Sequence, residues 1–132
     1  MSDDPRVHAL QRFLEGLRPG LNDHPEMLPT LDAVASRHAL SRLLELACSA
    51  QHIGNIQLGR RYLADVPRAW LLDHIQPVAE EMLASGDDWE YRRLLELYER
   101  LDEGLLKELI ARGLVSENRE IREAAEDFAK KV

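Results

Sequence analysis

The chain has a single cysteine, Cys48, among its 132 residues, so no disulfide can form within it. A chain of this length can bury about two thirds of the surface that it exposes when unfolded, so one hydrophobic core suffices without a metal or disulfide. Because Cys48 lies on the apolar face of a helical stretch, we interpret it as a small buried side chain and not as a reactive thiol. The sequence therefore predicts one domain, residues 1–132.

Aromatic residues make up only 5% of the chain and prolines number six, a composition that suits an all-helical protein. No apolar run approaches the length of about 18 residues that indicates a membrane-spanning helix. The opening segment, MSDDPRVHAL, is acidic and lacks the basic and apolar regions of a secretory signal. We therefore expect a cytoplasmic protein that does not associate with a membrane.

The chain also has no excess of basic residues, and its net charge is −7. Residues 1–66 carry 7 basic and 8 acidic side chains, whereas residues 67–132 carry 10 basic and 16 acidic side chains. Nucleic-acid binding depends on clustered Lys and Arg that neutralise phosphates, and this balance opposes it. The acidic C-terminal half favours either a basic protein partner or simple solubility.

Apolar residues recur with helical spacing along the whole chain, and no segment alternates as a strand does. We therefore predict an all-α fold of about seven helices. The expected helices are residues 5–17, 30–49, 56–66, 67–84, 89–100, 102–112 and 119–131. Pro77 falls inside the fourth helix, where its ring removes an amide donor and should kink or briefly break the helix.

Polar residues that can cap a helix precede most of these segments. The predicted N-caps are Thr30, Asn55, Asp88, Asp102 and Asn118. Residues 85–87 are expected to form a turn. Gly113 is expected to end the sixth helix in the left-handed conformation, with Leu114 packing back on Leu109.

From residue 30 onward the predicted helices fall into three consecutive pairs. The second helix of each pair begins near an Asx residue, and these residues are Asn55, Asp88 and Asn118, at separations of 33 and 30. If the first pair is matched by its apolar face instead, Ile56 aligns with Tyr91 at a separation of 35. Both registers stay open for the first pair, whereas the later two pairs agree.

The second helices of the last two pairs share a pattern of an Asx residue, an apolar residue, an arginine and further apolar residues. They read Asn118-x-x-Ile121-Arg122-x-x-Ala125-x-x-Phe128 and Asp88-x-x-Tyr91-Arg92-x-x-Leu95-x-x-Tyr98. This pattern resembles the second helix of a HEAT-type, or armadillo-type, repeat, and a proline in the first helix, here Pro77, is similar to that family. The resemblance covers residues 30–131. It implies a short right-handed α-solenoid of three HEAT-like helix pairs, with residues 1–29 as an N-terminal capping helix and loop.

Each helix pair in such a repeat has an apolar face that it buries against its neighbours, and the second helices then line a shallow concave surface. Six polar residues on those helices are candidates for contact: Arg60, Arg61, Arg92, Arg93, Glu96 and Arg122. Arg92 and Arg122 recur at one repeat position, where each could instead bond to turn carbonyls. For Arg60, Arg61 and Arg93 a solvated face is an equal alternative. The last helix adds three glutamates, so the surface should grade from basic to acidic.

Two tryptophans complete the candidate contact residues. Trp70 and Trp89 are expected near turns between helices, where they can cover the ends of the core. If they are exposed instead, they are suited to anchor a partner, because tryptophan is enriched among the residues that dominate binding energy.

Motifs that carry catalysis or metal binding are absent from the sequence. The five histidines show no metal-ligand spacing, and there is no phosphate-binding loop, dinucleotide glycine pattern or nucleophile motif. We therefore predict no catalytic residue, no metal and no cofactor.

The function we predict is a non-enzymatic protein-binding module that uses the inner face of the helical stack. One version is an immunity-type inhibitor of a basic protein. Nucleic-acid recognition by a HEAT-like concave surface, as in some DNA-repair glycosylases, is an alternative that the acidic half opposes. A small-molecule enzyme with a pocket that no motif reveals is the other alternative, and the oligomeric state stays open.

Overall fold

The computed structural model describes residues 4–49, 52–85 and 88–131, and these residues are all-α, as predicted. They form seven α-helices and one 3-10 helix, with no strand in these ranges. The elements are α1 (Pro5–Leu17), η1 (Pro25–Thr30), α2 (Ala33–Ala47), α3 (Ile53–Asp65), α4 (Arg68–Ser85), α5 (Asp88–Leu101), α6 (Glu103–Leu114) and α7 (Arg119–Ala129). The sequence did not predict η1, which lies in the segment expected to be a loop.

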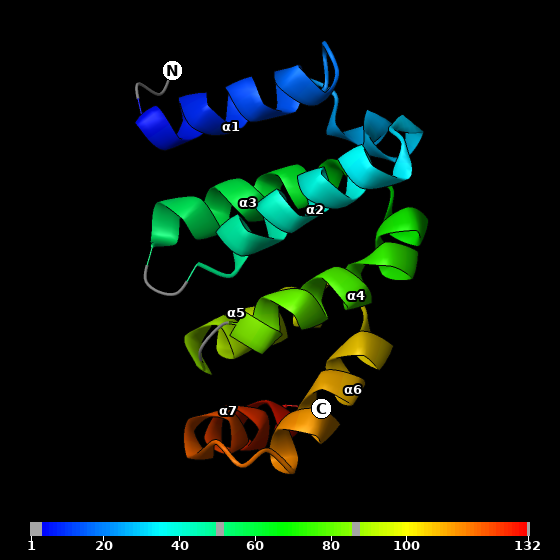
Figure 1. The fold of residues 1–132 in the computed structure, drawn as a ribbon. Coiled ribbons are helices and arrows are strands. Elements are labelled where there is room, and N and C mark those ends of the chain that lie inside the picture. Colours follow the sequence, from blue (N-terminus) through cyan, green and yellow to red (C-terminus); the bar gives the residue numbers. More distant parts are fainter. Residues whose placement is uncertain (1–3, 50–51, 86–87, 132) are drawn as a thin grey trace.

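The helices lie in successive layers, with α1 at one end and the pair of α6 and α7 at the other (Figure 1). Between these ends, α2 packs beside α3, and α4 packs beside α5. Contacts between layers connect α2 with α4 and α5 with α7.

One hydrophobic core extends through all the layers, from Leu10 in α1 to Phe128 in α7. The largest side chains that are fully buried are Leu10, Leu14, Leu21, Leu28, Leu40, Leu43, Leu44, Leu63, Leu71, Ile75, Leu94 and Leu95. Cys48 is also fully buried, as predicted, and burial raises the pKa of its thiol to about 12. Since neighbouring layers share this core, each layer depends on the next for the burial of its apolar face.

Two of the predicted N-caps are confirmed. The carboxylate of Asp102 accepts a hydrogen bond from the amide of Leu105 at 3.0 Å, at the start of α6. The side-chain oxygen of Asn118 accepts from the amides of Glu120 and Ile121, at 2.8 and 3.3 Å. These two caps satisfy amides that have no partner inside their own helices.

Three other predicted N-caps are wrong. Thr30 lies in η1, and the cap of α2 is Asp32, whose carboxylate accepts from the amide of Ala35. Asn55 lies inside α3, which is capped by His52 instead. Asp88 is itself the first residue of α5, and the predicted turn at 85–87 falls largely on residues 86 and 87, outside the described residues. Several polar side chains near one helix start can supply the acceptor, and sequence alone does not choose between them.

Gly113 does not end α6 in the left-handed conformation, because it lies inside the helix and its φ is not positive. Leu114 is 43% exposed, so it is not buried against Leu109 as expected. Gly113 is instead a point of close approach. A Cβ at this position would collide with the hydroxyl of Tyr91 and lie 2.8 Å from the Cβ of Ala125.

Pro77 lies within α4, which continues through it, so the predicted brief break does not occur. Figure 1 shows α4 changing direction after its first turns. A proline lacks the amide that would bond to the carbonyl four residues earlier, which is the usual cause of such a bend. None of the helices in the described ranges has the length and apolarity needed to cross a membrane.

Candidate functional site

The polar residues predicted for contact all lie on the second helices of the three pairs. Arg60 and Arg61 belong to α3, Arg92, Arg93 and Glu96 belong to α5, and Arg122 belongs to α7. Because α5 contacts α7 and an ion pair joins α3 to α5, these helices form one row. We call this row the second-helix row.

Three of the predicted residues meet in one ion cluster between α3 and α5. The Oε1 of Glu96 accepts a hydrogen bond from Arg60 at 2.9 Å, and its Oε2 accepts from Arg93 at 3.0 Å. The three side chains are only 18 to 29% exposed. Burial by itself would raise the pKa of Glu96, but the hydrogen bonds from both arginines outweigh it, so the pKa lies below its ordinary value. The cluster therefore keeps a carboxylate between two guanidinium groups.

The two arginines that recur in the sequence pattern have different partners. Arg92 pairs with Asp127 at 3.3 Å and so connects α5 with α7. Arg122 donates to the carbonyl of Ser116 at 2.6 Å and so holds the turn between α6 and α7. Arg122 thus has the turn-binding role that the sequence left open for it, whereas Arg92 bridges two layers.

Arg61 is exposed on α3, and its guanidinium lies 5.7 Å from the centre of the Tyr62 ring. Tyr62 is buried, and its hydroxyl donates to the side-chain oxygen of Asn22 at 2.5 Å. This bond attaches α3 to the loop after α1. Arg61 therefore stands on a fixed helix surface with its charged group toward solvent.

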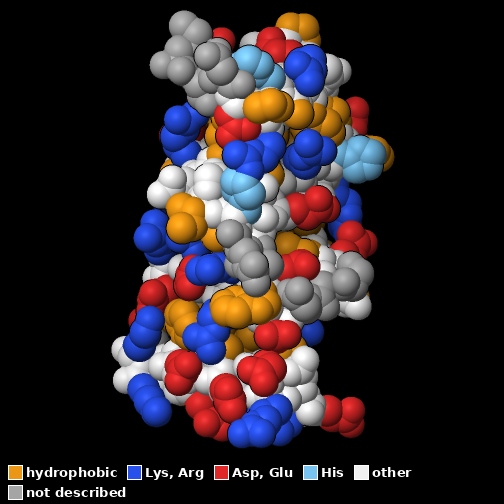
Figure 2. Space-filling model, turned by 90° about the vertical axis from the view of Figure 1, so that its left-hand side faces the viewer, with side chains coloured by type: hydrophobic (Ala, Val, Ile, Leu, Met, Phe, Trp, Pro, Cys, Tyr) orange, Lys and Arg blue, Asp and Glu red, His pale blue; other side chains and the backbone are white. Residues whose placement is uncertain are grey.

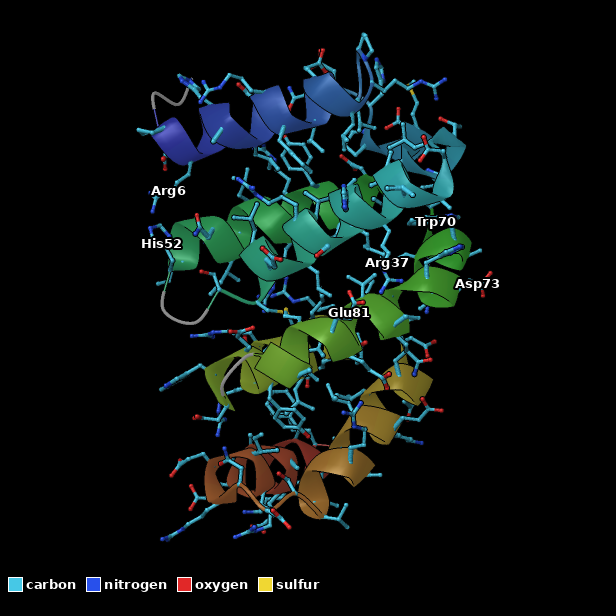
Figure 3. All side chains as sticks on the ribbon, in the orientation of Figure 1. Arg6, Arg37, His52, Trp70, Asp73 and Glu81 are labelled. Carbon is cyan, nitrogen blue, oxygen red and sulfur yellow. The ribbon has the colours of Figure 1, made fainter. Side chains whose placement is uncertain are left out.

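The two tryptophans differ in their exposure. Trp70 is half-buried against the core and stacks on His74, with ring centres 4.3 Å apart. Figure 3 shows Trp70 and Asp73 on the first turns of α4, at the edge opposite Arg6 and His52. Trp89 is 43% exposed at the start of α5. Trp70 therefore takes part in packing, whereas Trp89 offers part of its ring at the surface.

A groove between α3, α4 and α5 adjoins the second-helix row and was not predicted. Its volume is about 280 Å³. The apolar residues that line it include Leu63, Val66, Leu71, Leu97 and Leu101. Three arginines also line it, namely Arg60, Arg68 and Arg100. We call it the arginine groove. The sequence offered little signal for it, because Arg68 and Arg100 belong to different helices that only the packing of layers brings together.

Charge varies along the face that carries the turns between paired helices. In Figure 2 acidic side chains are most numerous on the lower part of this face, where Lys and Arg side chains also appear, and histidine side chains lie on the upper part. The exposed acidic residues of α7 are Glu120, Glu123, Glu126 and Asp127. The last layer is nearly neutral, however, because residues 103–132 carry 7 acidic and 6 basic side chains, so the acidic excess of the C-terminal half lies in residues 67–102.

Within the described ranges, no group of three or more His, Cys, Asp or Glu side chains is placed so that it could hold a metal ion. Comparisons with protein-family models, with curated proteins and with solved structures found no match to this chain. Its function must therefore be inferred from its own surface.

Proposed function

We propose that this chain is a non-enzymatic module that binds a protein partner on the second-helix row. The observation that carries this proposal is the pair of ion contacts, Arg60 with Glu96 and Arg92 with Asp127, that fix charged side chains from three successive layers in one row. Charged groups that are already held in position lose little conformational entropy when a partner binds. The row is therefore suited to recognise an arrangement of charges on another protein.

The architecture that we propose for this module is a short right-handed α-solenoid of HEAT-like pairs, with α1 as the cap. Links between the first helices of consecutive pairs support it. Arg37 of α2 pairs with Glu81 of α4 at 2.7 Å, and both are marked in Figure 3. Glu80 of α4 pairs with Arg112 of α6 at 3.0 Å. Such contacts between equivalent helices of neighbouring units are what a stack of repeats requires.

The partner that we propose presents a basic region to the last layer. Glu120 and Glu126 of α7 are exposed and form no ion pair with a described residue, so they can pair with cations of a basic surface. An inhibitor of a basic protein would use this end of the molecule. Nucleic acid would be repelled by the same carboxylates.

Affinity capture with the purified, tagged chain tests this proposal. We expect one protein to be retained by the wild type and to lose at least about tenfold in affinity with the double variant Glu123→Arg/Glu126→Arg on α7. The matched control is Lys107→Glu on α6, which also alters an exposed charge but lies off the row. Retention that is equal for the wild type and the α7 variant would contradict the proposal.

Two further measurements separate this function from its alternatives. Binding to DNA at low salt that disappears at high salt would favour nucleic-acid recognition. Turnover in a metabolite panel that is lost when a histidine or carboxylate is replaced would favour an enzyme. The proposal predicts that neither is observed.

A further inference from the structure

The arginine groove combines an apolar lining with three guanidinium groups, not all of which have an ion pair. Arg68 donates to the carbonyl of Leu101 at 2.6 Å and lies 3.5 Å from the carboxylate of Asp102. Arg60 pairs with Glu96 through Nη2, but its Nε is buried without a hydrogen-bond partner. Arg100 is exposed and has no ion pair with any described residue. The groove therefore has one exposed guanidinium, that of Arg100, without an ion pair to the described residues and next to apolar side chains.

We propose that the arginine groove binds an acidic peptide segment of a partner, in which a large apolar side chain is flanked by carboxylates. This inference rests on the proposed protein-binding function and names the chemistry of one bound segment. The apolar side chain would lie against Ala64 and Leu101, the apolar lining residues that are not fully buried, and a neighbouring carboxylate would pair with Arg100. A partner with one acidic segment and one basic region could then contact both Arg100 and the exposed carboxylates of α7.

The size of the groove suffices for one large apolar side chain. Its volume of about 280 Å³ is close to the lower end of the range of roughly 300 to 1,000 Å³ that is typical of ligand pockets. A single leucine, phenylalanine or tryptophan side chain of a peptide requires less space than such a ligand. Large apolar side chains that enter a pocket are also the usual anchors of protein interfaces.

The charges around the groove favour a peptide over nucleic acid or a basic segment. Glu96 and Asp102 already pair with Arg60 and Arg68, so Arg100 is the lining arginine without an ion pair to the described residues. Nucleic acid needs several unpaired cations to neutralise successive phosphates. A basic segment would be repelled by Arg100. A short segment with one or two carboxylates matches the available charge and can form the bidentate pair that arginine favours.

Fluorescence anisotropy with an array of labelled hexapeptides tests the inference. The probes carry pairs of leucine, isoleucine, phenylalanine or tryptophan at the centre and aspartate or glutamate at both ends. One comparison array keeps the apolar centres with lysine and arginine ends, and another keeps the acidic ends with a glycine-serine centre. We expect binding only by members of the first array. Absence of binding by the first array up to millimolar peptide, or equal binding by either comparison array, would overturn the inference.

Variants locate the binding site of any peptide that binds. Arg100→Glu and Ala64→Glu each place a negative charge in the groove at an exposed position, and we expect either to weaken binding by at least about tenfold. The control is Arg12→Glu, which makes the same charge change on the exposed surface of α1. Equal affinity for Arg100→Glu and Arg12→Glu would overturn the inference. Thermal unfolding followed by circular dichroism checks that all three variants are folded.

The capture experiment distinguishes failure of this inference from failure of the proposed function. If Glu123→Arg/Glu126→Arg releases the partner while Arg100→Glu retains it and no acidic peptide binds, the groove inference is overturned and the protein-binding function stands. If the α7 variant and Arg100→Glu both retain the partner as the wild type does, both proposals are overturned.

Discussion

The first and last helix pairs both approach closely around a glycine, but the atoms that exclude a side chain differ. At Gly59 of α3, an added Cβ would collide with the backbone nitrogen of Ala47 and lie 2.8 Å from the carbonyl oxygen of Leu43, both in α2. At Gly113 of α6, it would collide with the hydroxyl of Tyr91, which belongs to α5. The first pair therefore packs backbone against backbone, whereas the last pair makes room for a side chain from the preceding layer.

This difference shows how the last layer depends on the layer before it. The hydroxyl of Tyr91 donates to the carbonyl of Leu109 in α6 at 2.8 Å, and burial raises the pKa of this tyrosine to about 12. The space above Gly113 is thus used by a buried hydrogen bond between α5 and α6. The contact at Gly59 involves only the two helices of its own pair. Nothing in the sequence distinguishes the two glycines, but a side chain is excluded by the backbone of α2 at Gly59 and by the side chain of Tyr91 at Gly113.

The largest effect is expected for Gly59→Ala. The backbone of α2 cannot move away without separating the two helices, so the substitution should cost about 3 kcal/mol in the free energy of unfolding, measured by urea denaturation. A cost below about 1 kcal/mol would show that α2 and α3 do not approach this closely.

A smaller effect is expected for Gly113→Ala, about 2 kcal/mol, because the end of the Tyr91 side chain can move more easily than a backbone. Tyr91→Phe alone should cost about 1 kcal/mol through loss of the hydrogen bond to Leu109. The double variant should cost less than the sum of the two, because removal of the hydroxyl relieves the main collision. Additive costs in a double-mutant cycle would contradict the shared contact.

Glu96→Gln should come next, with a cost of about 1 kcal/mol after allowance for solvent screening, because Arg60 and Arg93 lose their shared anion. The matched control is Glu103→Gln, which breaks an exposed pair with Lys107 and should cost about 0.3 to 0.5 kcal/mol. Urea denaturation near neutral pH measures both. Equal costs would mean that the cluster between α3 and α5 adds nothing beyond a surface pair.

The pH dependence of Glu96 follows from its lowered pKa. Because the folded protein holds the carboxylate more strongly than the unfolded chain, this stabilisation is fully present above the unfolded pKa of about 4.3. It is lost as the pH falls through the folded pKa. The difference in unfolding free energy between wild type and Glu96→Gln should therefore shrink in acid, and a difference that grows in acid would contradict the assignment.

A modest effect of the opposite sign is expected for Gly16→Ala in α1. An added Cβ there meets no atom within 4 Å, so alanine should stabilise the helix by about 0.5 to 1 kcal/mol. This variant is also the control for the other glycine substitutions. Destabilisation by Gly16→Ala would show that glycine-to-alanine costs in this protein do not report close helix contacts.

The sequence by itself determined the local structure of this protein. The spacing of apolar residues was enough to predict the seven α-helices, because one face of each helix must be buried. The caps at Asp102 and Asn118 were predictable for the same local reason, since each side chain bonds to amides two or three residues away. The competing caps Asp32 and His52 show the limit of this reasoning, because more than one nearby side chain could take the position.

Only the tertiary structure decided the features that join distant residues. A side chain is excluded at Gly113 because the hydroxyl of Tyr91, from another layer, lies against it. The local sequence pattern had predicted a helix end there instead. Glu96 accepts hydrogen bonds from Arg60, which is 36 residues away in the sequence, and from Arg93 on its own helix. The arginine groove exists because packing places Arg68 and Arg100 beside the same apolar surface. Helix spacing fixes which face of a helix is buried, but the packing of side chains between layers decides which faces meet.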